Sequence, residues 1–337
     1  MNWKGKKVLV TGGTGFLGSR VVRKLRNRHC GHIFTFHSRD FDLRNEAEVE
    51  RLFATERWDI VLHLAAIVGG IGSNQKNPAT FFHDNALMGI HLVEHAWRNG
   101  VEKFVGVGSV CAYPRETPLP FHESELWRGY PDDTNAPYGL AKRMLLVQLQ
   151  AYRNQYGLDG IYLIPSNLYG PGDHFDPETS HVIPALIRKF QEAIDDGSDS
   201  VVIWGDGSPT RDFLHVDDAA EGILLATEGY SSPEPVNLGS GREISIRELA
   251  ELIASEMGYD GNFVWDTSKP NGQPRRRLDI GRAREAFGFR PTRVLEAELA
   301  STIRWYLKQR DGATRPLIPL KNRKKHRPIS PLWHNEK

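Results

Sequence analysis

A glycine-rich turn directly after an apolar run constrains this chain more than any other feature. The run Lys7–Thr11 is typical of a strand, and Gly13-x-Gly15-x-x-Gly18 follows it at once. Glycines at this spacing allow a tight turn and let the backbone approach a diphosphate at the start of a helix, which we expect from about Phe16. A turn without a ligand is the alternative, but the place of the motif between strand and helix favours a dinucleotide site.

Strands and helices then alternate, which favours one fold class. Continuous apolar strands are expected in a parallel sheet covered on both faces, and the longer stretches between them have helical spacing. We therefore predict an α/β fold with a Rossmann-type, doubly wound parallel sheet. Further strands are predicted at 33–37, 60–64 and 104–108, and helices at 46–55, 79–99 and 138–156.

The pattern loosens after residue 170, which suggests a smaller C-terminal lobe. We assign residues 1–170 to the dinucleotide-binding domain, with returning segments near 212–240, and residues 171–311 mainly to a substrate-binding lobe. The basic segment 312–337 contains four prolines and is predicted to be a mobile tail. Helices are predicted in the lobe at 183–193, 245–257 and 295–308, and a strand at 201–204.

Composition excludes several classes of protein. The 43 Lys and Arg nearly balance the 42 Asp and Glu, so no overall field favours nucleic acid or a membrane as partner. Two cysteines cannot build a secreted disulfide framework. Apolar stretches are too short for a signal region or a membrane span. We therefore expect a cytoplasmic protein.

The cofactor interpretation extends beyond the glycines. Arg39 follows the second predicted strand, where it could pair with the 2′-phosphate of NADP, whereas Asp40 keeps NAD possible. Asp42 and Leu43 are expected to contact adenine, and the small residue Ala65 ends the third predicted strand. The turn itself is expected to contribute Gly12, Gly13, Thr14, Gly15, Phe16, Leu17 and Gly18.

Ser109, Tyr138 and Lys142 form the predicted catalytic set. Hydride addition to a carbonyl leaves an alkoxide that needs a proton, and a tyrosine can supply it. Lys142 lies four residues after Tyr138, so both occupy one face of a helix, and its ammonium favours the phenolate. Ser109, at a strand end, can hydrogen-bond the same oxygen. These residues indicate an oxidoreductase.

Longer blocks of sequence carry a family resemblance over roughly residues 7–310. The chain resembles the extended short-chain dehydrogenase/reductases, and within them most closely the family of GDP-L-fucose synthases, which are GDP-4-keto-6-deoxy-D-mannose 3,5-epimerase-4-reductases. The matching blocks are Ala65-Ala-Ile-Val-Gly-Gly-Ile71, Gly108-Ser-Val-Cys-Ala-Tyr-Pro114, Thr134-Asn-Ala-Pro-Tyr-Gly-Leu-Ala-Lys142, Pro165-Ser-Asn-Leu-Tyr-Gly-Pro171, Ser180-His-Val-Ile-Pro-Ala-Leu186, the run from Trp204 to Asp218, and Ser268-Lys-Pro-Asn-Gly-Gln-Pro-Arg275.

The resemblance implies NADPH-dependent double epimerisation and reduction of a GDP-sugar. It implies that Cys111 and His181 serve as base and acid at the carbons beside the ketone. A homodimer is also implied, in which the helices at 79–99 and 138–156 pack against their copies. For the cofactor it adds Lys142, Pro165, Asn167, Leu168 and His181; for the substrate it adds Lys189, Trp204, Arg211 and Arg276, with Arg275 left as the alternative to Arg276.

Three departures from the family pattern keep alternatives open. Thr14 stands where the family often has an NADP-binding arginine, so NADP preference rests on Arg39. Lys189 replaces an arginine and Val110 replaces a serine. Related reductases or epimerases of modified GDP-heptoses or of the colitose pathway share most blocks. A non-catalytic nucleotide-sensing module is a further alternative, which the intact catalytic set argues against.

Overall fold

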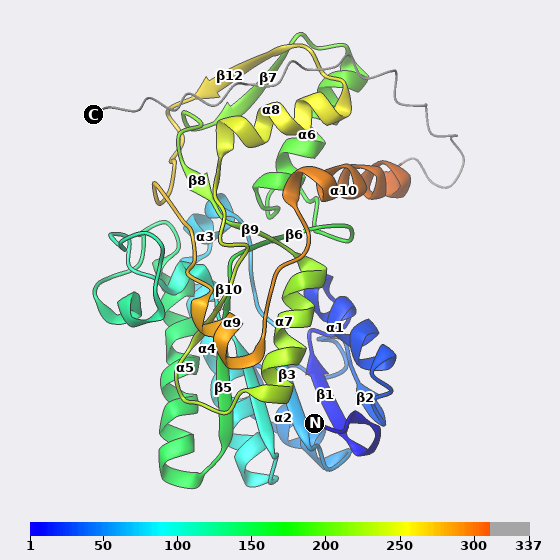
Figure 1. Ribbon diagram of the computed structural model, residues 1–337, viewed down its shortest axis with the longest axis vertical. Helices are drawn as coiled ribbons and strands as arrows, with labels where there is room; N and C mark the ends of the chain where they lie inside the picture. The colour runs from blue at the N-terminus through cyan, green and yellow to red at the C-terminus, as the bar shows by residue number, and fades with distance from the viewer. Residues whose placement is uncertain (311–337) are drawn as a thin grey trace, which may run out of the picture.

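A six-stranded parallel sheet is the centre of the larger lobe in this computed structural model, which describes residues 1–310 (Figure 1). The strand order is β10-β5-β4-β3-β1-β2, and all five pairings are parallel. The chain therefore leaves β1 in one direction for β2 and in the other for β3. Ligands of such sheets bind at this reversal, beyond the carboxyl ends of the strands. The strands are β1 Lys7–Thr11, β2 His32–Phe34, β3 Ile60–His63, β4 Lys103–Val107, β5 Asp159–Pro165 and β10 Val236–Leu238.

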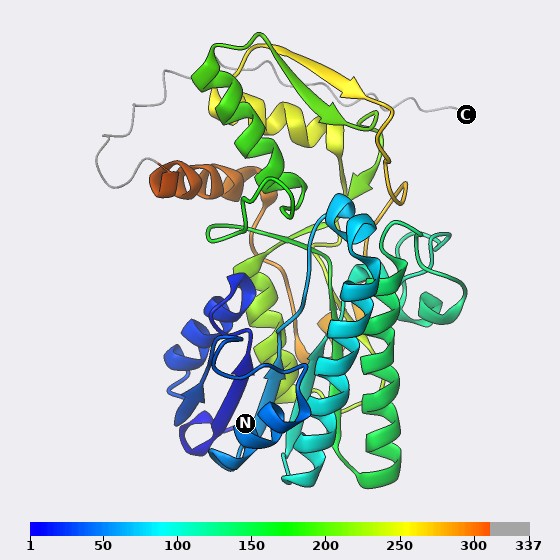
Figure 2. The same cartoon turned by 180° about the vertical axis from the view of Figure 1, so that it is seen from behind.

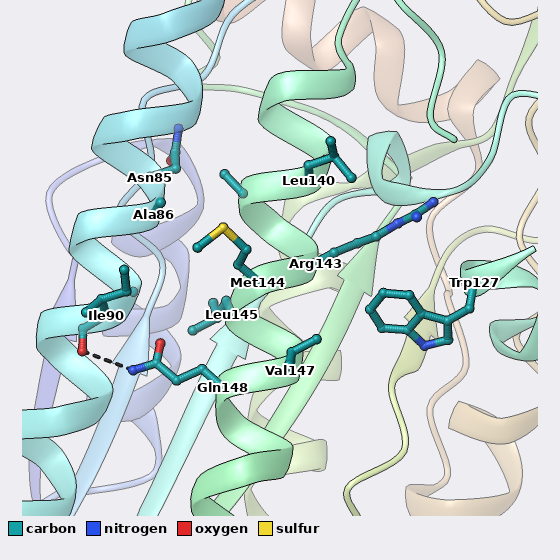
Figure 3. Close-up of a pocket in the computed structure, with 12 residues that line it drawn as sticks. Asn85, Ala86, Ile90, Trp127, Leu140, Arg143, Met144, Leu145, Val147 and Gln148 are labelled. Carbon is teal, nitrogen blue, oxygen red and sulfur yellow. Dashed lines mark hydrogen bonds between the residues drawn. The ribbon is translucent and has the colours of Figure 1, made fainter. Parts of the chain in front are cut away.

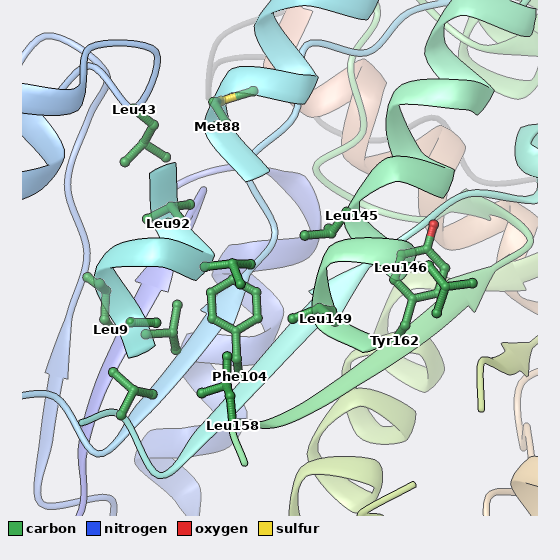
Figure 4. Close-up of a cluster of buried hydrophobic side chains, with 14 of the residues drawn as sticks. Leu9, Leu43, Met88, Leu92, Phe104, Leu145, Leu146, Leu149, Leu158 and Tyr162 are labelled. Carbon is green, nitrogen blue, oxygen red and sulfur yellow. The ribbon is translucent and has the colours of Figure 1, made fainter. Parts of the chain in front are cut away.

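Helices cover both faces of the sheet, as the two views show (Figures 1 and 2). On one face, α2 (Glu46–Ala54), α4 (Pro78–Arg98) and α5 (Ala136–Tyr156) pack over the cluster of Figure 4, where Leu92, Phe104 and Leu149 are almost fully buried. The other face carries α1 (Phe16–Asn27), α7 (Val216–Gly229) and α9 (Gly281–Phe287). The predicted fold class, a doubly wound parallel sheet, is confirmed.

The smaller lobe has its own apolar cluster, centred on Phe190 and Ile253. Its strands β7 and β12 pair in parallel at one end of the molecule (Figure 1). Two short pairs, β6 with β9 and β8 with β11, lie between this lobe and the sheet. The elements are α6 Val182–Asp196, β7 Ser200–Trp204, α8 Ile246–Met257, β12 Asn262–Asp266, α10 Leu295–Arg310, β6 Asn167–Tyr169, β9 Phe213–His215, β8 Thr210–Arg211, β11 Ile244–Ser245 and α3 Ile71–Lys76.

Some boundaries differ from the sequence-based expectations. The strand predicted to reach His37 ends at Phe34, because β2 is the edge strand and pairs only with residues 7–9 of β1. β5 and β12 were not predicted. In β5, a glycine and a terminal proline interrupt the apolar run, so burial within the sheet, and not local pattern, makes it a strand. The division near residue 170 stays a prediction, and the tail 312–337 lies outside the described residues.

Candidate active site

Two adjoining pockets lie beyond the carboxyl ends of β1, β3, β4 and β5. The larger has a volume of about 650 Å³ and runs from the glycine turn past Ser109 to His181. The smaller, of about 110 Å³, continues from it toward the second lobe. The residues that line both are Ile71, Asn135, Asn167, Leu168 and His181. A long ligand could therefore place its reacting end where the pockets meet.

The glycine turn has the shape that a diphosphate site needs. Gly12 has φ +67°, and a Cβ there would lie 2.8 Å from the backbone nitrogen of Ala65. A Cβ on Gly18 would lie 2.0 Å from the carbonyl oxygen of Gly12, so only glycine fits. No side chain caps the N-terminus of α1 at Gly15. The first N–H groups of this helix are thus open to an anion, and the residues fit a dinucleotide.

The structure places only some of the predicted adenosine contacts in the large pocket. Asp42 and Leu43 line the large pocket, whereas the Arg39 side chain is 80% exposed and does not line it. Sequence reasoning missed Arg44, which lines the pocket and makes ion pairs of 2.8 Å with Asp42 and 3.0 Å with Asp84. Because two carboxylates already hold Arg44, Arg39 remains the more available cation for a 2′-phosphate.

Ser109, Tyr138 and Lys142 meet in the large pocket. Tyr138 and Lys142 lie near the start of α5, and Lys142 Nζ lies 5.9 Å from the centre of the tyrosine ring and donates to the carbonyl of Val107 at 3.0 Å. Burial lowers the pKa of Lys142 to about 8. Burial also raises the pKa of Tyr138 well above its usual value, an effect that nearby Cys111 increases and Ser109 reduces. The phenol is thus kept protonated, ready to donate.

Cys111 sits in a short 3-10 helix, η2 (Val110–Ala112), that Ser109 caps. The backbone N–H of Cys111 donates to Ser109 Oγ at 3.2 Å, which holds the cysteine close to the serine. Two donors approach the sulfur, Asn135 Nδ2 at 3.4 Å and Arg276 Nη1 at 3.6 Å. The structure thus brings the predicted carbon base beside the predicted ketone site.

His181 occupies the N-cap position of α6 and lines both pockets. The residue as a whole is exposed, but loss of solvation around the imidazole lowers its pKa, and nearby His174 lowers it further. A lowered pKa makes the imidazolium a stronger acid and leaves the imidazole mostly neutral near pH 7. Cys111 and His181 line one pocket from separate elements, so they can approach a ligand from different directions.

Two buried guanidinium groups line the small pocket. Arg211 and Arg276 are 9% and 6% exposed, and neither has a carboxylate within ion-pairing distance among residues 1–310. Burial and the neighbouring Arg276 lower the pKa of Arg211 to about 9. Arg275, in contrast, is 56% exposed and pairs with Glu243. The structure therefore favours Arg276 over Arg275 as the arginine that faces a ligand.

The structure does not bring Lys189 and Trp204 into either pocket. Trp204 is 50% exposed and lies beside Gly72 of α3, the residue after Ile71, which lines both pockets. Lys189 Nζ donates to the carbonyl of Val202 at 2.8 Å and lies 5.9 Å from the centre of the Trp204 ring. Lys269 lies 5.5 Å from the same ring. These residues form an outer cationic and aromatic surface.

The structure gathers most of the other predicted contacts in the large pocket, although Gly13 does not line it, and it adds Asn135, which sequence reasoning missed. Ala65, Pro165, Asn167 and Leu168 all line the large pocket. Asn135, which ends the loop before α5, lines both pockets, contacts the Cys111 sulfur and is only 6% exposed. Its place in the matching block from Thr134 to Lys142, three residues before Tyr138, was the available signal, but an asparagine before a helix is more often a cap.

Comparison with known proteins identifies the family. The model of the family described as "NAD dependent epimerase/dehydratase family" matches residues 8–239, which include most of the sheet and the whole predicted catalytic set. The chain belongs to this family. The predicted nicotinamide cofactor is thereby supported at the level of the family. None of the helices in residues 1–310 is both long and apolar enough to cross a membrane. The same residues contain no group of three or more His, Cys, Asp or Glu placed to hold a metal ion.

Relatives within the NAD dependent epimerase/dehydratase family confirm the narrower resemblance. GDP-L-fucose synthase 1 of Arabidopsis thaliana is 42% identical over 91% of this chain and 95% of its own length. GDP-L-fucose synthase of Escherichia coli is 40% identical over 91% and 98%. Among solved structures, a GDP-L-fucose synthetase from Naegleria fowleri bound to NADP has a TM-score of 0.83 at 31% identity, covering 93% of this chain and 97% of that one.

Proposed function

We propose that this chain converts GDP-4-keto-6-deoxy-D-mannose and NADPH to GDP-L-fucose and NADP by epimerisation at C3 and C5 and reduction at C4. The relatives named GDP-L-fucose synthase support the substrate class. One observation carries the double chemistry: Cys111 and His181 line the same pocket as Ser109, Tyr138 and Lys142. A reductase alone has no need for a second acid–base pair beside its carbonyl site.

NADP is the proposed form of the cofactor. The Naegleria structure is named as bound to NADP, and the exposed Arg39 is suited to bind a 2′-phosphate. Bound NADPH would supply a hydride to the sugar C4. The glycine turn and the N-terminus of α1 would hold its diphosphate, and Ala65, Pro165, Asn167 and Leu168 would enclose the rest.

In the reduction, the chain's own groups manage the carbonyl oxygen. Ser109 and Tyr138 would hydrogen-bond the C4 oxygen, and Tyr138 would give it a proton as negative charge develops. Lys142 carries a positive charge below its pKa of about 8 and so favours the phenolate that remains. Because both side chains lie on one turn of α5, their spacing is set by the helix itself.

In the epimerisation, the ketone acidifies the hydrogens at C3 and C5. The Cys111 thiolate would take the proton from such a carbon, so that the C–H bond breaks, an S–H bond forms and the electron pair moves onto the C4 oxygen as an enolate. His181, once protonated, would return a proton to the other face of that carbon. Cysteine suits this task because its thiolate is accessible near neutral pH.

The GDP part of the substrate would lie along the small pocket and beyond it. Arg211 and Arg276 are buried cations that lack carboxylate partners among the described residues, so a diphosphate would neutralise them. Trp204 and Lys189, outside both pockets, would meet the nucleoside. We place them in this outer role because neither lines the pocket that holds the catalytic set.

A related GDP-sugar reductase is the second candidate. A GDP-6-OMe-4-keto-L-xylo-heptose reductase from C. jejuni has a TM-score of 0.85 at 26% identity, covering 91% of this chain and 99% of that one. Its fold is thus as similar as that of the fucose synthetase. A reductase of this kind would leave C3 and C5 untouched.

We also infer that the protein is a homodimer. An apolar groove of about 520 Å³ lies between α4 and α5, with Ile90, Met144 and Val147 beside it and Trp127 at its edge (Figure 3). These four side chains are 38% to 53% exposed. A second copy would cover them by pairing the same two helices. A cytoplasmic location stays a prediction.

Product analysis tests the proposal in one experiment. The enzyme, NADPH and GDP-4-keto-6-deoxy-D-mannose are incubated in heavy water, and the product is analysed by NMR. The proposal expects GDP-L-fucose with deuterium at C3 and C5. Reduced product without deuterium would support the related reductase, and no oxidation of NADPH with any keto-sugar nucleotide would support a nucleotide-sensing module.

A further inference from the structure

Only the nitrogen of the Asn135 side-chain amide has a hydrogen-bond partner among the described residues. Its Nδ2 donates to Cys111 Sγ at 3.4 Å, and its Oδ1 is buried without a hydrogen-bond partner among residues 1–310. The residue is 6% exposed and lines both pockets. Orphaned buried acceptors are uncommon because they have lost water without compensation. The position of Asn135 therefore points to a role toward the sulfur and the ligand.

Arg276 supplies a second donor to the same sulfur from the far end of the sequence. Its Nη1 lies 3.6 Å from Cys111 Sγ, and its Nε donates to Gln273 Oε1 at 2.7 Å. Gln273 is fixed in turn by donating to the carbonyl oxygens of Pro114 and Arg115. The guanidinium is thus held in place by the loop after Cys111, and no carboxylate competes with the sulfur for it among the described residues.

We propose that Asn135 and Arg276 are positioning residues that hold the Cys111 sulfur as a thiolate for the epimerisation step. This inference rests on the proposed epimerase activity. An amide N–H and a guanidinium are donors without a lone pair to offer, so they favour S⁻ over S–H. The Oδ1 of Asn135, which has no partner in the described residues, would accept a hydrogen bond from a hydroxyl of the bound sugar. Binding of the sugar and alignment of the base would then depend on one side chain.

Other charged or titratable groups also face the sulfur. Tyr138 and Arg211 interact with it electrostatically, and Asp132 lies near Arg211. His181 lines the same pocket. Burial keeps Tyr138 neutral at ordinary pH. Asn135 and Arg276 differ from all of these in that their donor atoms reach the sulfur within hydrogen-bonding distance.

The test measures thiolate character without sugar or cofactor. Iodoacetamide alkylation of Cys111 is followed by mass spectrometry between about pH 5 and pH 10, the range around the ordinary thiol titration. Asn135→Asp and Arg276→Gln are expected to slow alkylation at pH 7 by about tenfold or more and to move the profile to higher pH, since a donor to a charged group is lost. Arg275→Gln is the matched control for Arg276→Gln and should leave the Cys111 profile as in the unmodified chain. Alkylation of Cys30 is the internal reference, and its profile should be the same in every variant.

The outcomes separate this inference from the proposed function. An unshifted Cys111 profile in both variants, with NADPH binding and melting temperature unchanged, would overturn the inference even if C3 and C5 exchange deuterium. A shifted profile supports the role toward the thiolate, and deuterium exchange that falls in parallel supports its use in epimerisation. If Asn135→Asp does not fold, Asn135→Ala removes the same donor without adding charge.

Discussion

The Lys142 ammonium lies 5.9 Å from the centre of the Tyr138 ring, one helical turn along α5. Both side chains are buried, which lowers the pKa of Lys142 to about 8 and raises the pKa of Tyr138. Below about pH 8 the pair is therefore a charged lysine beside a protonated phenol. This combination suits the direction in which a ketone is reduced.

Tyr138→Phe should remove most of the reduction. The variant lacks the proton donor, and a positioned general acid typically contributes about 10²- to 10⁴-fold in rate. Because the glycine turn is untouched, NADPH affinity should change little from that of the unmodified chain. NADPH oxidation and fluorescence titration measure the two effects. Near-normal turnover would contradict the role assigned to Tyr138.

Cys111→Ala should separate the two half-reactions. The sulfur addresses the carbon acids and not the ketone oxygen, so deuterium incorporation at C3 and C5 should fall by about 10²-fold or more. Hydride transfer to the unepimerised ketone should persist and give a different reduced sugar. NMR of the product in heavy water distinguishes the two. Formation of GDP-L-fucose at the normal rate would show that another residue is the base.

Arg39→Ala tests the choice of cofactor. Loss of a guanidinium that pairs with the 2′-phosphate should raise the Kd of NADPH by about tenfold or more, while the Kd of NADH should not change. Arg44→Ala is the comparison, because Asp42 and Asp84 already occupy that guanidinium. It should affect both cofactors to the same extent. Equal affinities of Arg39→Ala and the unmodified chain for NADPH would place the phosphate elsewhere.

Asp173 makes stability depend on pH. Burial raises its pKa to about 7, and one carboxylate oxygen has no partner among the described residues. The folded state keeps a proton that the unfolded state releases near pH 4, so this group's contribution to stability falls as pH rises from about 4 to 7. Asp173→Asn should therefore stabilise the protein at pH 8, by on the order of 2–4 kcal/mol.

Denaturant unfolding of Asp173→Asn and of the unmodified chain at pH 4 and pH 8 checks this prediction. The increase in the free energy of unfolding should be small at pH 4. Asp176→Asn, in the same loop, is the matched control with the opposite expected sign. Its carboxylate accepts from the Glu178 and Thr179 backbone N–H groups and from the Thr179 hydroxyl. Destabilisation by Asp173→Asn at pH 8 would mean that the ionised carboxylate has an unrecognised partner.

Charge placed in the α4–α5 groove should break the dimer. Val147→Glu would put a carboxylate into an apolar contact of two helices, where an unpaired buried charge is costly. Sedimentation at micromolar concentration should then show monomer in place of dimer. Val264→Glu changes an equally exposed apolar residue on β12, 48% against 49%, and should remain dimeric. A monomeric unmodified chain would reject the dimer itself.

Local pattern was sufficient for the β-α-β framework and for the relative placement of part of the predicted catalytic set. The turn at Gly12 to Gly18 and the pair of Tyr138 and Lys142 each lie within a few residues of chain. Turn geometry and the helical repeat therefore determine them directly. The apolar runs of β1, β3 and β4 are readable for the same reason, because strands buried on both faces have no polar residues to obscure them.

Contacts between distant segments were decided only by the tertiary structure. Arg276 and Cys111 are 165 residues apart, and nothing in either segment alone indicates that the guanidinium reaches the sulfur. The choice between Arg275 and Arg276 depends on which side chain the packed loop buries. The same packing leaves Trp204 outside both pockets. Local rules extend over about one helical turn, whereas a site at a sheet edge is assembled from loops that meet only when the core closes.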